Sequence, residues 1–163
     1  MRVGTYARSG RRPARNTLTM VRLAVVAALV FAAPAAATQP QPQQFETIGQ
    51  LTGPTTVSGT WTATGVVEAT GTYIETFRFA GETIHAEKVL VNSSGTIVLR
   101  TRALVVWLDA CTATFRAGSW QIAEATGAYA GLRGGGTPLA TSSYGNVCSG
   151  NVEVVHAGAA DDD

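Results

Sequence analysis

Two ionisable residues, Glu75 and Lys88, lie on the apolar side of a segment that otherwise separates apolar from charged residues. Tyr73, Phe77 and Trp107 share that side, so one acid and one base stand among aromatic rings. An isolated charge is very costly to bury, and the two residues are therefore expected to pair. One interpretation is a salt bridge at the mouth of the fold, from which the Lys88 ammonium extends toward solvent. The other is a polar spot in an apolar pocket, which would hold a ligand carboxyl, carbonyl or phenol.

The opposite side of the same segment carries its other charged residues. Glu87 is expected opposite Arg100, with Arg78 and Arg102 diagonally nearby. A solvent-exposed ladder of cross-strand charges explains this pattern, and each such pair contributes about 0.2–1 kcal/mol. A functional anion site is the alternative.

The sequence does not predict a nucleophilic hydrolase. His85 falls among the arginines of the charged side, His156 lies close to the chain end, and no Gly-x-Ser-x-Gly motif occurs. A metal site would need more ligands than Cys111, Cys148 and these two distant histidines. We therefore assign no catalytic residue, no metal and no cofactor.

Three consecutive strands joined by two tight turns position these side chains. They are predicted at residues 72–80, 83–92 and 96–108, with turns at Gly81-Glu82 and Ser93-Ser94. Closing each turn over two residues sets Glu75 opposite Lys88. By the same rule Phe79 faces Ile84, Phe77 faces Ala86, Leu90 faces Ile97, Lys88 faces Leu99, and Ala86 faces Thr101. Alternation along each strand places all of these on one face with Val105, which predicts a half-buried antiparallel sheet.

Residues 1–37 are predicted to be a secretory signal peptide. Six arginines precede an apolar run at 23–33, and Ala35-Ala36-Ala37 fits the small-x-small rule for cleavage after Ala37. The apolar run has eleven residues, whereas a membrane-spanning helix needs about 20. Met20 is an alternative start that would leave a shorter leader. We therefore expect a secreted, extracellular protein with no membrane anchor after cleavage.

Removal of the leader changes the net charge from +1 to −5, because six basic residues remain against all eleven acids (6 − 11). A mildly acidic protein lacks the electrostatic footprint that nucleic acid or anionic lipid requires. Cys111 and Cys148 both lie in the exported part, and an even pair outside the cytoplasm predicts a disulfide. Closing a loop of about 36 residues would stabilise the fold by about 3–4 kcal/mol.

The composition after the leader is that of an all-β protein. It has nineteen Thr and twelve Val, and no segment sustains a helical period. Further strands are predicted at 45–51, 56–69, 111–117, 120–124 and 147–156, with an edge strand at 137–143 because of Pro138. Gly59 and Gly65 suggest bulges or corners within 56–69.

Strand number and spacing together predict one small antiparallel β-barrel of about eight strands at 45–158. Residues 38–44 alternate Gln and Pro and are expected to form a linker without core residues. Residues 159–163 are expected to form a solvated acidic tail.

One stretch resembles a known family. Ala125-Thr126-Gly127-Ala128-Tyr129-Ala130-Gly131-Leu132-Arg133-Gly134 resembles the Gly-Thr-Gly-x-aromatic…Arg-Gly loop of dirigent proteins and of the related allene oxide cyclase barrel. It is also similar to secreted actinobacterial proteins that share this barrel. The resemblance implies a barrel fold and cofactor-free activity, either guiding the coupling of phenoxy radicals or guiding a ring closure in an apolar pocket. It carries no catalytic residue onto this chain.

The physical role of this stretch is that of a corner. Gly127 and Gly131 permit a positive φ or a close chain approach, Tyr129 and Leu132 can tuck under the end of the sheet, and Arg133 can cap it. The rim of a ligand site is the alternative interpretation.

These observations favour a binding or interaction module for a small apolar or aromatic ligand. The candidate ligand-binding residues are Tyr73, Glu75, Phe77, Lys88 and Trp107. The alternative is a cofactor-free, dirigent-like coupling guide or cyclase that acts in the same pocket. Pairing of Glu75 with Lys88 weakens that alternative, because an enzyme of this kind would need an acid or tyrosine without a structural partner.

Overall fold

The computed structural model describes residues 39–137 and 143–162, which form nine β-strands and no helix. The strands are β1 (Gln41–Gly53), β2 (Thr56–Gly65), β3 (Ala69–Ala80), β4 (Thr83–Asn92), β5 (Gly95–Trp107), β6 (Thr112–Gly127), β7 (Arg133–Gly136), β8 (Tyr144–Asn146) and β9 (Asn151–Asp161). The described part therefore contains no helix that could cross a membrane. The predicted signal peptide and most of the predicted strand at 137–143 lie outside the described residues.

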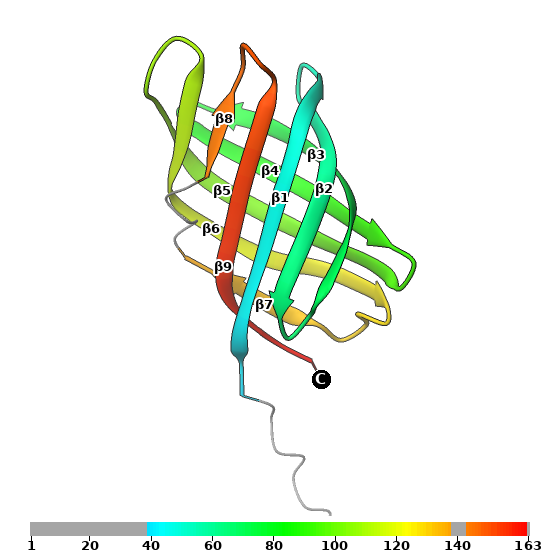
Figure 1. Cartoon of the computed structure of the whole chain (residues 1–163). Helices are drawn as coiled ribbons and strands as arrows, with labels where there is room; N and C mark the ends of the chain where they lie inside the picture. Colours follow the sequence, from blue (N-terminus) through cyan, green and yellow to red (C-terminus); the bar gives the residue numbers. More distant parts are fainter. Residues whose placement is uncertain (1–38, 138–142, 163) are drawn as a thin grey trace, which may run out of the picture. The chain divides into compact units, whose positions relative to one another are not determined.

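All nine strands belong to one antiparallel sheet whose pairings form a ring. Consecutive strands pair from β1 to β7, β7 pairs with β9, and β9 pairs with β1, which gives a ring of eight strands. Figure 1 shows β9 running beside β1 on the near side. The short strands β7 and β8 bridge β6 and β9 at separate positions, near Trp120 and near Thr114 respectively.

The predicted meander is confirmed with its register. Glu75 lies opposite Lys88, Phe77 opposite Ala86 and Phe79 opposite Ile84. In the next pairing Leu90 lies opposite Ile97, Lys88 opposite Leu99 and Ala86 opposite Thr101. Two-residue turns leave no freedom for a slip, and a slip would have turned the apolar set outward.

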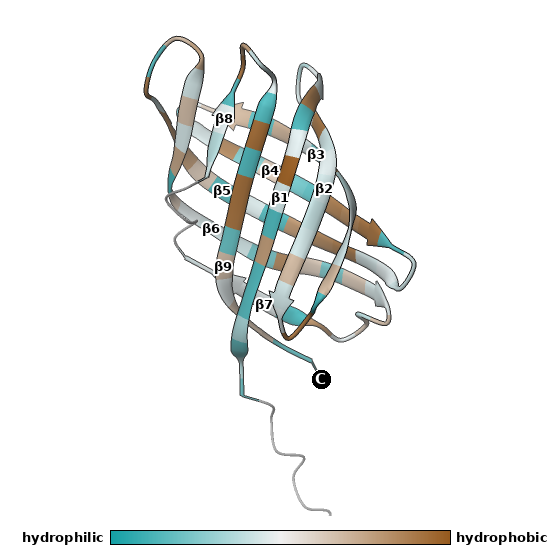
Figure 2. Cartoon of the chain, viewed as in Figure 1, coloured by the Kyte–Doolittle hydropathy of each residue, from teal (hydrophilic) through white to brown (hydrophobic). Residues whose placement is uncertain are grey.

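Alternation of side chains also holds in strands that are far apart in the sequence. Figure 2 shows bands of apolar and polar residues alternating along β1 and β9. The residues that point inward form the core, which includes the fully enclosed side chains of Phe45, Trp61, Leu90, Ile97 and Leu99. The Phe45 ring meets the Trp120 ring edge to face, with centroids 5.6 Å apart, a favoured geometry for aromatic pairs.

The predicted linker at 38–44 and the predicted tail at 159–163 are wrong in part, because most of their described residues belong to strands β1 and β9. β1 begins at Gln41 rather than at Phe45, and β9 continues to Asp161, because these ends pair with each other from Gln41 opposite Ala160 onward. Gln43 is buried, and its side-chain carbonyl accepts a hydrogen bond from the Val67 amide at 2.8 Å. Strands pair through backbone groups, so a segment with mostly polar side chains can join a sheet without showing an apolar pattern in the sequence.

Two predicted strands, at 111–117 and 120–124, are one strand, β6, of 16 residues. The break expected between them is a bulge, where the pairing with β5 shifts between Arg102 and Leu104 and Ala117 adopts a φ of 47°. The predicted bulge at Gly59 is absent from both of its pairings. Gly59 instead lies against the β1 backbone, where an added Cβ would stand 2.0 Å from the Ile48 carbonyl oxygen.

The predicted disulfide between Cys111 and Cys148 is present. It ties the loop between β5 and β6 to the turn between β8 and β9. Asp109 shapes the loop between β5 and β6, because its carboxylate accepts hydrogen bonds from the Cys111 and Thr112 amides at 2.7 and 2.6 Å. These two backbone hydrogen bonds lower the pKa of the Asp109 carboxyl.

The stretch 125–134 turns the chain from β6 into β7, as a corner would. Gly127 and Gly131 have φ values of 66° and 98°, and Tyr129 and Leu132 are buried. The Tyr129 hydroxyl accepts a hydrogen bond from the Asn92 amide at 2.7 Å, which joins this corner to the turn between β4 and β5. An added Cβ on Gly127 would lie 2.3 Å from the Ser94 carbonyl oxygen.

Gly127→Ala should therefore destabilise more than Gly81→Ala. Both glycines have a positive φ near 65°, at 66° and 63°, but nothing lies within 4 Å of a Cβ built on Gly81. The left-handed backbone costs each alanine about 1–2 kcal/mol, and only Gly127→Ala adds a collision with backbone. Urea unfolding should show a difference of at least about 1 kcal/mol between the variants. Equal losses would contradict the close packing of this corner.

Candidate functional site

An apolar cavity of about 230 Å³ opens at one end of the ring. Its walls come from strands all around the ring. Phe77 and Phe79 belong to β3, Val105 and Trp107 to β5, Ala113 and Phe115 to β6, and Val152 to β9, and Leu51, Val57, Ile84 and Val147 complete the lining. The lining is apolar except for Glu75 and Asn146.

The order of residues along β3 gives the depth of this cavity. Phe79 is 55% exposed and marks the mouth, Phe77 is half-buried, and Glu75 is 4% exposed. Tyr73, the next inward residue, no longer lines the cavity. Four residues of strand span about 13 Å, so Glu75 lies at the floor of a narrow, deep site.

Glu75 forms a buried ion pair with Lys88. Lys88 is 1% exposed, so its ammonium does not extend toward solvent as one sequence interpretation expected. The lysine Nζ contacts Oε2 of Glu75, and within the described residues Oε1 accepts no hydrogen bond. The cavity floor is therefore a hydrogen-bond acceptor whose partner lies on the core side.

Tyr73 closes the core side of this pair. The Lys88 ammonium lies 5.9 Å from the centre of the Tyr73 ring, within the range of a cation–π contact. The hydroxyl is enclosed near Thr47 without reaching hydrogen-bond geometry with any described group. Burial, and secondarily the Glu75 carboxylate, raise the pKa of this hydroxyl well above its ordinary value, so it stays neutral.

His156, whose position near the chain end gave no sign of a site role, is also a buried ionisable group. It is fully enclosed on the core side, and its Nδ1 lies 3.3 Å from the Phe45 carbonyl oxygen. A carbonyl only accepts, so the proton is on Nδ1, and Nε2 accepts from the Thr101 hydroxyl at 3.1 Å. Burial, followed by the nearby Lys88 charge, lowers the pKa of His156 well below its ordinary value.

The predicted site residues thus separate into two groups. Glu75, Phe77 and Trp107 line the cavity, whereas Tyr73 and Lys88 lie behind its floor. Sequence reasoning missed the walls contributed by β1, β6, β8 and β9. Alternation of Val152, Val154 and His156 on one face of β9 was a usable signal, and both valines and the histidine are buried.

No group of three or more His, Cys, Asp or Glu that could hold a metal occurs in the described parts of the chain. Comparisons of the sequence with protein-family models and curated proteins, and of the fold with solved structures, find no match. The resemblance to dirigent proteins and allene oxide cyclases therefore stays a prediction.

Lys88→Met should strongly destabilise the protein, because it leaves the Glu75 carboxylate buried and unpaired. Loss of one partner of a buried pair costs about 3–5 kcal/mol. The double variant Glu75→Gln/Lys88→Met should recover more than half of that loss in urea unfolding at pH 7. Arg100→Met is the control, because it breaks an exposed pair with Glu87 and should cost at most about 1 kcal/mol. Similar losses for Lys88→Met and Arg100→Met would contradict a buried pair.

The lowered pKa of His156 predicts that acid destabilises the fold. Between that lowered value and the unfolded pKa of about 6.5, the unfolded chain binds a proton that the folded chain does not. The free energy of unfolding should fall by about 1 kcal/mol between pH 7.5 and pH 5.5. His156→Gln, which retains a donor and an acceptor, should remove this part of the slope. Identical pH profiles for the two proteins would refute the assignment.

Proposed function

We propose that this chain is a secreted β-barrel protein that binds a small apolar or aromatic ligand in its interior. The observation that carries the proposal is the apolar cavity with the paired Glu75 carboxylate at its floor. In this interpretation the ring of eight strands is the barrel, and the cavity is its mouth. The disulfide is compatible with an extracellular protein.

Cavity volume limits the size of the ligand. A volume of about 230 Å³ lies between the engineered cavity of about 150 Å³ that holds benzene and the lower limit of about 300 Å³ for drug-sized pockets. A single aromatic ring with one or two short substituents matches this space. The walls offer aromatic partners for that ring in Phe77, Phe115 and Trp107.

Chemistry at the floor selects the substituent. Glu75 Oε1 can only accept a hydrogen bond, so a ligand hydroxyl or amine is favoured and a ligand carboxylate is repelled. Lys88 already holds Oε2 of Glu75 in an ion pair, and Tyr73 does not line the cavity. Binding therefore accounts for the geometry better than dirigent-like catalysis does.

Three para-substituted toluenes test this function: para-cresol and para-xylene, which have nearly equal shape, and para-toluate, which carries a carboxylate. Isothermal titration calorimetry should give the tightest binding for para-cresol, about tenfold weaker binding for para-xylene, and none for para-toluate. Ala113→Leu, which fills the wall, should abolish binding. Ala110→Leu is the matched control, because Ala110 is exposed and lies outside the cavity. Absence of binding for all three probes would contradict the proposal.

A further inference from the structure

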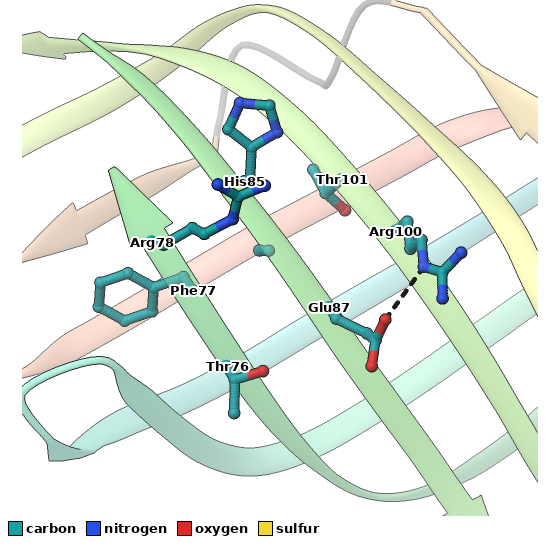
Figure 3. A pocket seen from close by; sticks show the side chains of 8 residues that line it. Thr76, Phe77, Arg78, His85, Glu87, Arg100 and Thr101 are labelled. Atoms are coloured by element: carbon teal, nitrogen blue, oxygen red, sulfur yellow. Dashed lines mark hydrogen bonds and ion pairs between the residues drawn. The ribbon is translucent and has the colours of Figure 1, made fainter. Parts of the chain in front are cut away.

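Three basic side chains form a row on the outer face of the sheet, here called the basic row: Arg78, His85 and Arg102. Arg78 of β3 lies directly opposite His85 of β4, which lies directly opposite Arg102 of β5. Figure 3 shows Arg78 and His85 together on neighbouring strands. An open groove of about 360 Å³ on this face is lined by Arg78 and His85 themselves, together with Thr76, Glu87 and Arg100. Arg102 lies outside its lining.

The basic row is not neutralised. In the neighbouring row of the same face, Glu87 pairs with Arg100 at 3.0 Å (Figure 3). By contrast, the side chains of Arg78, His85 and Arg102 make no hydrogen bond or ion pair with any described residue. The two guanidinium groups lie on either side of the His85 ring, and no carboxylate belongs to this row. The positive charge of these two arginines is therefore available to an anion from solution.

The charge distribution makes this face distinct from the rest of the protein. Residues 39–162 hold six lysine and arginine residues and ten acidic residues, a net charge of −4 with both histidines neutral (6 − 10). Lys88 is buried, and four of the five arginines, at positions 78, 100, 102 and 116, lie exposed on β3, β5 and β6. A positive face on an acidic protein attracts a negatively charged partner to one orientation.

We propose that the basic row binds an extended polyanion that carries phosphate or sulfate groups. Guanidinium groups bind such oxyanions with two parallel hydrogen bonds, and an imidazole between them adds a third donor. Strands lie about 4.8 Å apart, so the row spans about 10 Å across β3, β4 and β5. Successive charged groups of a chain match this length, whereas a single tetrahedral ion contacts only part of it. The site lies outside the cavity and is independent of the proposed ligand.

Direct titration with inorganic polyphosphate tests the proposal, and heparin serves as the sulfated counterpart. At low salt we expect both polymers to bind, with inorganic phosphate and sulfate at least tenfold weaker. Arg78→Gln/Arg102→Gln should weaken polymer binding at least tenfold. It should also reduce the slope of log Kd against log salt concentration by about 1 to 2, because up to two fewer charge contacts are made. The unchanged midpoint of urea unfolding will show that the variant is folded.

Two matched pairs of variants distinguish binding at the basic row from a general effect of net charge. Arg102→Gln and Arg133→Gln remove the same charge, but only Arg102 belongs to the basic row, so only Arg102→Gln should weaken binding substantially. Glu87→Gln and Glu153→Gln remove the same negative charge, and only Glu87→Gln should tighten binding, because it releases Arg100. Equal effects within either pair would overturn the proposal. Absence of polymer binding at low salt, or equally tight binding of single ions, would also overturn it.

Discussion

The buried ion pair between Glu75 and Lys88 is the constraint on which the interior depends. Moving each charge out of water costs several kcal/mol, so the pair persists only because geometry and neighbours compensate. The direct register between β3 and β4 supplies the geometry, and the Tyr73 ring lies within cation–π range of Lys88. The pair also divides the interior, with an apolar cavity on the Glu75 side and the closed core around Phe45 on the other.

Enclosure of that interior depends on contacts between the two ends of the described chain. β1 pairs with β9 along ten residue pairs from Gln41 to Gln50, and this closes the ring. The disulfide connects two segments at the cavity end, next to Trp107 and Val147, which both line the mouth. A cavity with half-exposed aromatic walls keeps its shape only if these segments are held together, and the covalent bond restricts their separation.

Because successive side chains of a strand point to opposite faces, the sheet has an apolar inner face and a charged outer face. Phe77 points into the cavity, whereas Arg78, the next residue, points outward into the basic row. The same alternation puts Lys88 inside and Glu87 outside, where it pairs with Arg100. The proposed inner site relies on exclusion of water and one hydrogen-bond acceptor, and the proposed outer site relies on exposed charge that salt screens. A substitution can therefore alter one site and leave the backbone of the other in place.

By itself, the sequence determined the all-β class, the register of β3, β4 and β5, the disulfide and the pairing of Glu75 with Lys88. These follow from period-two alternation and short turns, which are local properties. Only the tertiary structure decided that Gln41 and Asp161 belong to the sheet, because strand pairing there is made by backbone groups whatever the side chains. It also decided the cavity walls and the partners of the His156 ring, Thr101 and the Phe45 carbonyl. These depend on which strands meet when the ring closes, and sequence periodicity contains no information about such long-range partners.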